Sequence, residues 1–126
     1  MSLVVFVGFN GVYLALTGDL EKPGWDALLE KQGFSNYLAK TTILLAPHHG
    51  REAGVCHEAL NLMSPMLCVI SDGPFSDTSS NVYSALASGA NVVQAGSPIT
   101  RRSLSTRKDG TVHISISQRE WKVEID

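Results

Sequence analysis

The sequence predicts an α/β fold in which a mixed β-sheet carries helices on one face. Between residues 18 and 94, β-rich apolar runs alternate with segments whose apolar residues recur at helical spacing. Ahead of them, two apolar runs at 3–9 and 12–17 are separated by Asn10-Gly11, a strong hairpin signal because both turn residues need positive φ. The chain has 126 residues, 44% of them hydrophobic, which is enough for one domain with a core and too short to favour two.

The remaining elements follow from local signals. A helix is expected after the hairpin, because Pro23 suits its first turn, Gly33 suits its end, and apolar residues recur at helical spacing between them. The later pattern predicts further strands and helices in alternation, with strands at 42–46, 66–71 and 91–94 and helices at 55–63 and 79–88. A closing hairpin is predicted from 103–106 and 111–117, which Lys108-Asp109-Gly110 separates.

The composition argues against several classes of protein. A formal net charge of -2 gives no overall attraction to nucleic acid, so any polyanion contact must come from a local patch. Cys56 and Cys68 form no Cys-x-x-Cys pair, which argues against a zinc ribbon or disulfide scaffold and favours reduced, structural thiols. No apolar run approaches the roughly 20 residues of a membrane span. We therefore expect no membrane segment in this chain.

Metal-ligating side chains follow two of the predicted strands. Asp19 comes after the apolar run that ends at Thr17-Gly18, and His48-His49-Gly50 closes the run that ends at Pro47. Strands that end in a carboxylate and in imidazoles deliver both to one edge of a sheet, and divalent zinc or manganese favours that mixture. Four histidines with no His-x-His pair are too few for a two-metal centre. The sequence therefore predicts part of a metal site.

Four segments, taken in order and spacing, resemble one family. They are Tyr13 to Glu21, Ala46-Pro47-His48-His49-Gly50, Val69-Ile70-Ser71-Asp72-Gly73 and Thr106 to Val112. Together they resemble the metallo-β-lactamase fold, in particular the branch found at the C-terminus of the ComEC DNA-uptake proteins and in stand-alone relatives. The resemblance implies an αββα sandwich of two similar halves, of which residues 1–126 would be the C-terminal half.

The resemblance also implies what this chain lacks. The first half of such domains supplies a His-x-His-x-Asp-His loop, and this sequence contains none. Either the chain is a fragment of a longer protein or it is a degenerate stand-alone remnant, and its start within an apolar strand favours the fragment. The missing N-terminal half of the domain is then the first expected partner. The face of the sheet that this half would cover is expected to be exposed and to favour a homodimer. Its residues would include Val5, Val7, Tyr13 or Leu14, Ile43 and Val69.

The resemblance assigns roles to the candidate ligands. Asp19 would bridge two divalent ions, although an aspartate at this place could equally cap the next helix. On an extended strand end, His48 and His49 would point in opposite directions, so only one can ligate. We assign His49 to the metal and His48 to the phosphate or leaving group, with the reverse assignment and a solvated loop left open. Gly50 would let the backbone approach substrate, or is a plain turn glycine.

Other polar residues are weaker candidates. Asp77 could hydrogen-bond a ligand or cap the following helix, in a segment where many relatives carry a His-Pro element that this chain lacks. Arg101 and Arg102, with Arg107 and Lys108, form a basic cluster that suits a phosphodiester backbone or is a solvated face. His57 and His113 are expected to be structural or surface residues rather than ligands.

The resemblance implies metal-dependent hydrolysis, in particular by a phosphodiesterase or nuclease, with zinc or manganese activating water. This chain alone is expected to be inactive because its ligand set is incomplete. The alternative is a binding or interaction module that keeps the fold and has lost the chemistry. Nucleic acid or another phosphodiester is the expected partner of the hydrolase.

Overall fold

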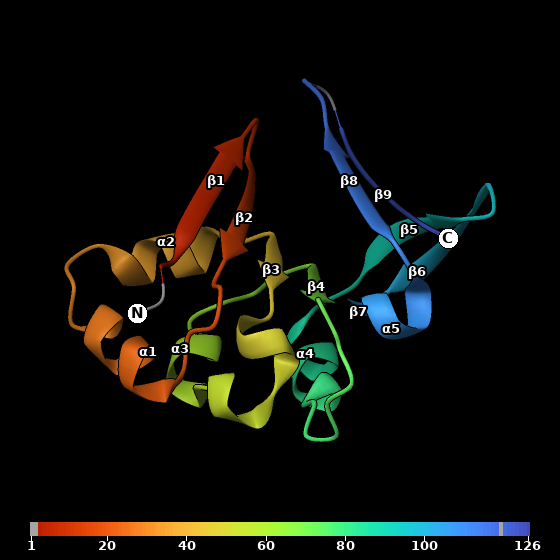
Figure 1. The fold of residues 1–126 in the computed structure, drawn as a ribbon. Coiled ribbons are helices and arrows are strands. Elements are labelled where there is room, and N and C mark those ends of the chain that lie inside the picture. The colour runs from red at the N-terminus through yellow and green to blue at the C-terminus, as the bar shows by residue number, and fades with distance from the viewer. Residues whose placement is uncertain (1–2, 119) are drawn as a thin grey trace.

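The computed structural model describes residues 3–118 and 120–126, which form an α/β fold with two mixed sheets (Figure 1). The elements in chain order are β1 (Val5–Phe9), β2 (Val12–Leu16), α1 (Lys22–Leu29), α2 (Phe34–Lys40), β3 (Ile43–Leu45), the 3₁₀ turns η1 (Pro47–Gly50) and η2 (Glu52–Gly54), α3 (His57–Leu60), β4 (Leu67–Ile70), α4 (Ser80–Leu86), β5 (Ala90–Gln94), β6 (Ser97–Arg101), β7 (Ser103–Ser105), α5 (Thr106–Asp109), β8 (Val112–Ile116) and β9 (Trp121–Ile125).

The first sheet has the strand order β1-β2-β3-β4-β7. β1 and β2 form the predicted antiparallel hairpin, with φ of 49° at Asn10 and 82° at Gly11. β2, β3, β4 and β7 run parallel, so the loops that follow β2, β3 and β4 all leave the sheet at the carboxyl ends of these strands. These loops carry the candidate ligands.

The second sheet has the order β6-β5-β9-β8 and was not anticipated. The predicted closing hairpin is wrong, because its two strands lie in different sheets. β7 pairs parallel with β4, whereas β8 pairs antiparallel with β9. A period-two pattern shows which face of a strand is buried but not which strand lies beside it. Here the burial of Leu104, which is 1% exposed, holds β7 in the first sheet.

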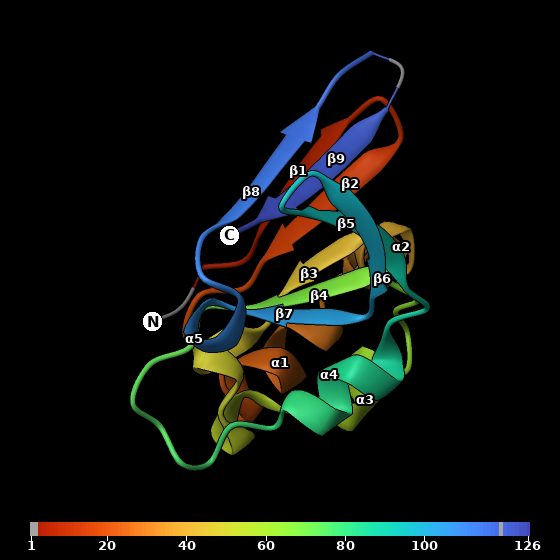
Figure 2. The same ribbon diagram turned by 90° about the vertical axis from the view of Figure 1, so that its right-hand side faces the viewer.

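The two faces of the first sheet have different coverings, which Figure 2 shows from the side. Helices pack on one face, around Trp25, Leu38 and Tyr83. The second sheet packs on the opposite face, so the expectation that this face is exposed is wrong at Ile43 and Val69, which are 2% and 7% exposed. The outermost strand remains uncovered, with Val5 and Val7 at 39% and 45%.

Four elements had no predicted counterpart, namely α2, β6, α5 and β9. The helix expected at 55–63 spans only His57–Leu60. Cys56 and Cys68 are buried and unpaired with each other, and burial raises the pKa of the Cys68 thiol to about 12. Within the described residues, none of the helices has the length and apolar character needed to cross a membrane.

Candidate metal centre

The two candidate histidines lie in a left-handed turn, η1, directly after β3. His48 has φ 53° and ψ 42°, His49 has φ 56° and ψ 30°, and Gly50 has φ 72°. The expectation that the histidines continue an extended strand is therefore wrong. A residue other than glycine costs about 1–2 kcal/mol in this conformation, and such strain is concentrated at functional sites.

Backbone hydrogen bonds hold this turn in place. The His48 N–H donates to the Gly18 carbonyl at 2.8 Å, which fixes the turn against the end of β2. The Ser79 N–H donates to the Gly50 carbonyl at 2.7 Å. Gly50 is buried, and a Cβ there would lie 2.8 Å from Cγ2 of Ile70. The sequence needs glycine at this position for packing, and its predicted approach to substrate stays a prediction.

Asp19 and His49 meet at the carboxyl ends of β2 and β3. Nε2 of His49 lies 3.6 Å from Oδ1 of Asp19, and both side chains are solvent-accessible. Nδ1 of His49 is 2.8 Å from the Ser71 carbonyl oxygen. Because a carbonyl can only accept, Nδ1 must donate, which leaves Nε2, on the side of Asp19, as the ring nitrogen that can bind an ion. A backbone carbonyl that orients the second ring nitrogen is typical of metal-ligating histidines. This pair therefore fits a divalent ion.

His48 points elsewhere. Its Nδ1 lies 3.7 Å from Oε1 of Glu21 and is buried, and no group in the described residues is within hydrogen-bond distance of it. The two adjacent histidines thus face different carboxylates. Their side chains were predicted to diverge by strand alternation, whereas a left-handed turn separates them. Within the part of the chain that the structure describes, no group of three or more His, Cys, Asp or Glu side chains could hold a metal ion.

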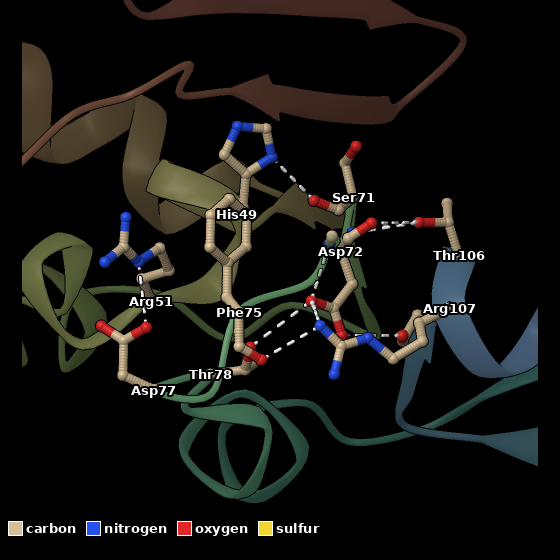
Figure 3. A network of polar contacts seen from close by, with 11 residues as sticks. His49, Arg51, Ser71, Asp72, Phe75, Asp77, Thr78, Thr106 and Arg107 are labelled. Carbon is tan, nitrogen blue, oxygen red and sulfur yellow. Dashed lines mark hydrogen bonds and ion pairs between the residues drawn. The ribbon is translucent and has the colours of Figure 1, made fainter.

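A third strand end carries a carboxylate that the sequence analysis left out. Asp72 follows β4, and its side chain is only 6% exposed. Its Oδ1 lies 3.2 Å from Nη2 of Arg107 and accepts the Gly73 N–H at 2.8 Å (Figure 3). Thr106 Oγ1 accepts the Asp72 N–H at 2.9 Å. An acidic residue directly after a buried strand, as at Asp19, was the signal that could have found it.

Phe75 connects this network to the histidine turn. Its ring centroid lies 5.4 Å from that of His49, and the Arg51 guanidinium lies 4.7 Å from the Phe75 ring centroid. Arg51 Nε also donates to Oδ1 of Asp77 at 3.0 Å, which holds the pKa of the Asp77 carboxyl below its ordinary value (Figure 3). Asp77 therefore fixes the loop beside the site, and its contact with a ligand stays a prediction.

The predicted basic cluster is half neutralised. Arg101 binds Asp109 through two hydrogen bonds of 2.9 and 3.0 Å, and Arg107 pairs with Asp72. Arg102 and Lys108 are exposed and form no ion pair within residues 3–118 and 120–126. Arg101, Arg107 and Lys108 line a polar pocket of about 400 Å³ that also receives Asp72 and Phe75. His57 and His113 are exposed and lie outside it.

An apolar cleft of about 740 Å³ lies between the two sheets. Its lining comes from β2, β3 and β4 on one side and β8 on the other, and includes Leu14, Ile43, Val69, Val112 and Ile114. Ser71, whose carbonyl orients His49, is also part of the lining. The cleft therefore adjoins the candidate metal site.

Comparisons of the chain with protein-family models, with curated proteins and with solved structures find no match.

Proposed function

We propose that this chain is the second half of a metallo-β-lactamase-like domain and carries part of the metal site of a hydrolase. The observation that supports it most is the pairing of Asp19 with His49. Two side chains 30 residues apart in the sequence meet at 3.6 Å, in the geometry of an oriented imidazole next to a carboxylate.

Asp19 and His49 would hold the divalent ion, and a partner segment would supply the remaining ligands. When bound, the ion would polarise the scissile group and lower the pKa of a water molecule. The chain's own contribution is orientation. The Ser71 carbonyl keeps the Nε2 lone pair of His49 available, and the Gly18 carbonyl keeps His48 on the far side of the turn, beside Glu21.

A phosphodiester is the substrate class that we propose. Arg102 and Lys108 are exposed and have no ion pair within the described residues, so they are better placed to meet a phosphate than Arg101 and Arg107, which Asp109 and Asp72 bind. Contacts of this kind go to the sugar-phosphate backbone and carry no sequence information.

The rival function is a binding module that has lost the chemistry. Its support is that the described residues provide a carboxylate and an imidazole but no third metal ligand beside them. The two functions differ in what the chain does with metal, because a module without a metal site has no reason to bind zinc at Asp19.

Calorimetric titration of the chain with Zn²⁺ tests the proposal. Two protein ligands are fewer than the three or four that zinc prefers, so we expect a Kd weaker than about 1 μM. Asp19→Asn and His49→Gln should each weaken binding at least about tenfold, because each removes one of two ligands.

Glu21→Gln is the matched control and should leave the affinity unchanged, since Glu21 faces His48 rather than His49. Zinc binding that survives both Asp19→Asn and His49→Gln would refute the proposed site. Nanomolar affinity in the unmodified chain would show a complete site and contradict the idea of a partial one.

A further inference from the structure

The first sheet ends in an open strand edge. β1 pairs with β2 on one side, and within residues 3–118 and 120–126 no strand pairs with its other side. The hydrogen bonds of β2 show which backbone N–H and C=O groups of β1 point to this open side. Tyr13, the register partner of Gly8, uses its N–H and C=O to bind Thr42, at 3.1 and 2.8 Å. In an antiparallel ladder the backbone groups of Gly8, and of Phe6 two residues away, therefore point to the open edge.

This edge lacks the usual protection. Natural sheet edges carry charges, prolines or bulges that prevent pairing with another chain. The first 18 residues contain no charged residue and no proline, and the β1–β2 register runs through five successive pairs without a bulge. An apolar row lies beside the edge on one face of the strand, with Val5, Val7 and Phe9 exposed by 39%, 45% and 49%.

We propose that β1 pairs antiparallel with β1 of a second copy of this chain, about a two-fold axis at Val7. The strand complements itself in this register. Phe6 of each copy lies opposite Gly8 of the other, so the outward N–H and C=O groups of both residues find partners. Such reciprocity, in which residue i meets j and j meets i, is the defining property of an isologous interface.

Side chains on both faces agree with this register. Phe6 is held on the helical face by Tyr37 and Phe34, whose ring centroids lie 5.2 and 5.9 Å from its own. The ring of Tyr13 covers Gly8 within the same chain, so on this face Phe6 of each copy would lie beside Tyr13 of the other. On the other face Val7 lies opposite Val7, and Val5 lies opposite Phe9, which extends the apolar row of one copy into the other. No charges are brought together, because the strand has none.

A charge-swap experiment tests both the partner and the register. Light scattering after size exclusion should show a dimer for the unmodified chain at high concentration. Val7→Lys and Val7→Glu should each be monomeric, because like charges would lie directly opposite each other across the axis. Mixing the two variants should restore dimers, since each lysine then faces a glutamate. We expect the dimer Kd of each variant alone to rise at least about tenfold.

Leu62→Lys is the matched control, because Leu62 is also 45% exposed and lies away from the edge. It should leave the dimer intact, and circular dichroism should show that all variants are folded. A strictly monomeric unmodified chain would overturn the proposal. So would a dimer that Val7→Lys leaves intact, or variants that stay monomeric when mixed. The result does not depend on zinc binding, so failure here leaves the proposed metal site untouched.

Discussion

At the residue scale, the left-handed turn at His48 and His49 is the feature that most separates this chain from an ordinary strand-to-helix loop. Two successive residues that carry a Cβ adopt positive φ here. Histidine is enriched among the non-glycine residues at positive φ, but only a few per cent of such residues adopt it, so local preference does not explain two in succession. The surrounding hydrogen bonds to Gly18 and Ser79 impose it, and its result is an imidazole aimed at Asp19.

Substitution at His49 measures that strain. At φ 56°, His49→Gly should be more stable than His49→Ala by about 1 kcal/mol, because only the alanine carries a Cβ that clashes in this conformation. Urea denaturation of the two variants gives the difference. The opposite order is expected at Ala85 in α4, where Ala85→Gly should lower the free energy of unfolding by about 0.5–1 kcal/mol. An alanine variant as stable as the glycine variant at position 49 would contradict the strained turn.

At the element scale, α1 supports the histidine turn from the helical face of the first sheet. Trp25 is fully buried, and its Nε1–H donates to the Gly54 carbonyl at 3.0 Å. Gly54 closes η2, four residues after the histidine turn ends, so one indole joins the helix to the loop that positions the site.

Trp25→Phe should therefore lower the free energy of unfolding by about 1–3 kcal/mol, because it leaves the Gly54 carbonyl buried without its donor. Trp121→Phe on β9 provides the comparison, since Trp121 is only half-buried and the described residues give its ring nitrogen no acceptor. Urea denaturation of both variants should show a clearly larger loss for Trp25. Equal losses would mean that the hydrogen bond to Gly54 contributes little.

Elements set by local chemistry were predictable from the sequence, and elements set by distant contacts were not. The Asn10-Gly11 hairpin follows from two residues that tolerate positive φ. β7 could not be placed in the same way, because its partner β4 lies 35 residues earlier at Cys68↔Ser103. The sequence does contain a helical pattern for α2, since the apolar residues Phe34 and Leu38 are four positions apart and both are buried. β6 contains Pro98, which strand patterns disfavour and which a strand at the edge of a sheet tolerates.

The same distinction applies to the candidate site. Asp19 and His49 could be proposed from the sequence because each follows a recognisable strand, and parallel strands bring such ends together. The ion-pair partners of the basic cluster could not be predicted from the sequence. Arg107 and Asp72 are 35 residues apart, and only the pairing of β4 with β7 brings them to 3.2 Å.

At the scale of the whole molecule, two hairpins lean together over the apolar cleft. The side-chain amide of Asn10, at the tip of the β1–β2 hairpin, donates to the Ser117 carbonyl at 3.2 Å, just after β8. The cleft beneath them opens beside Ser71, next to the candidate metal site. The chain thus combines an open strand edge at β1 with an apolar cleft that adjoins the candidate metal site.

The central claim is that Asp19 and His49, and not His48, form the metal-binding part of this chain. The most direct measurement is a Zn²⁺ titration followed by ¹⁵N NMR of the histidine ring nitrogens. We expect the Nε2 resonance of His49 to shift or broaden first, with its Nδ1 remaining protonated against the Ser71 carbonyl, while His48 is unchanged. A response at His48 before His49, or the same response in Asp19→Asn as in the unmodified chain, would contradict the claim.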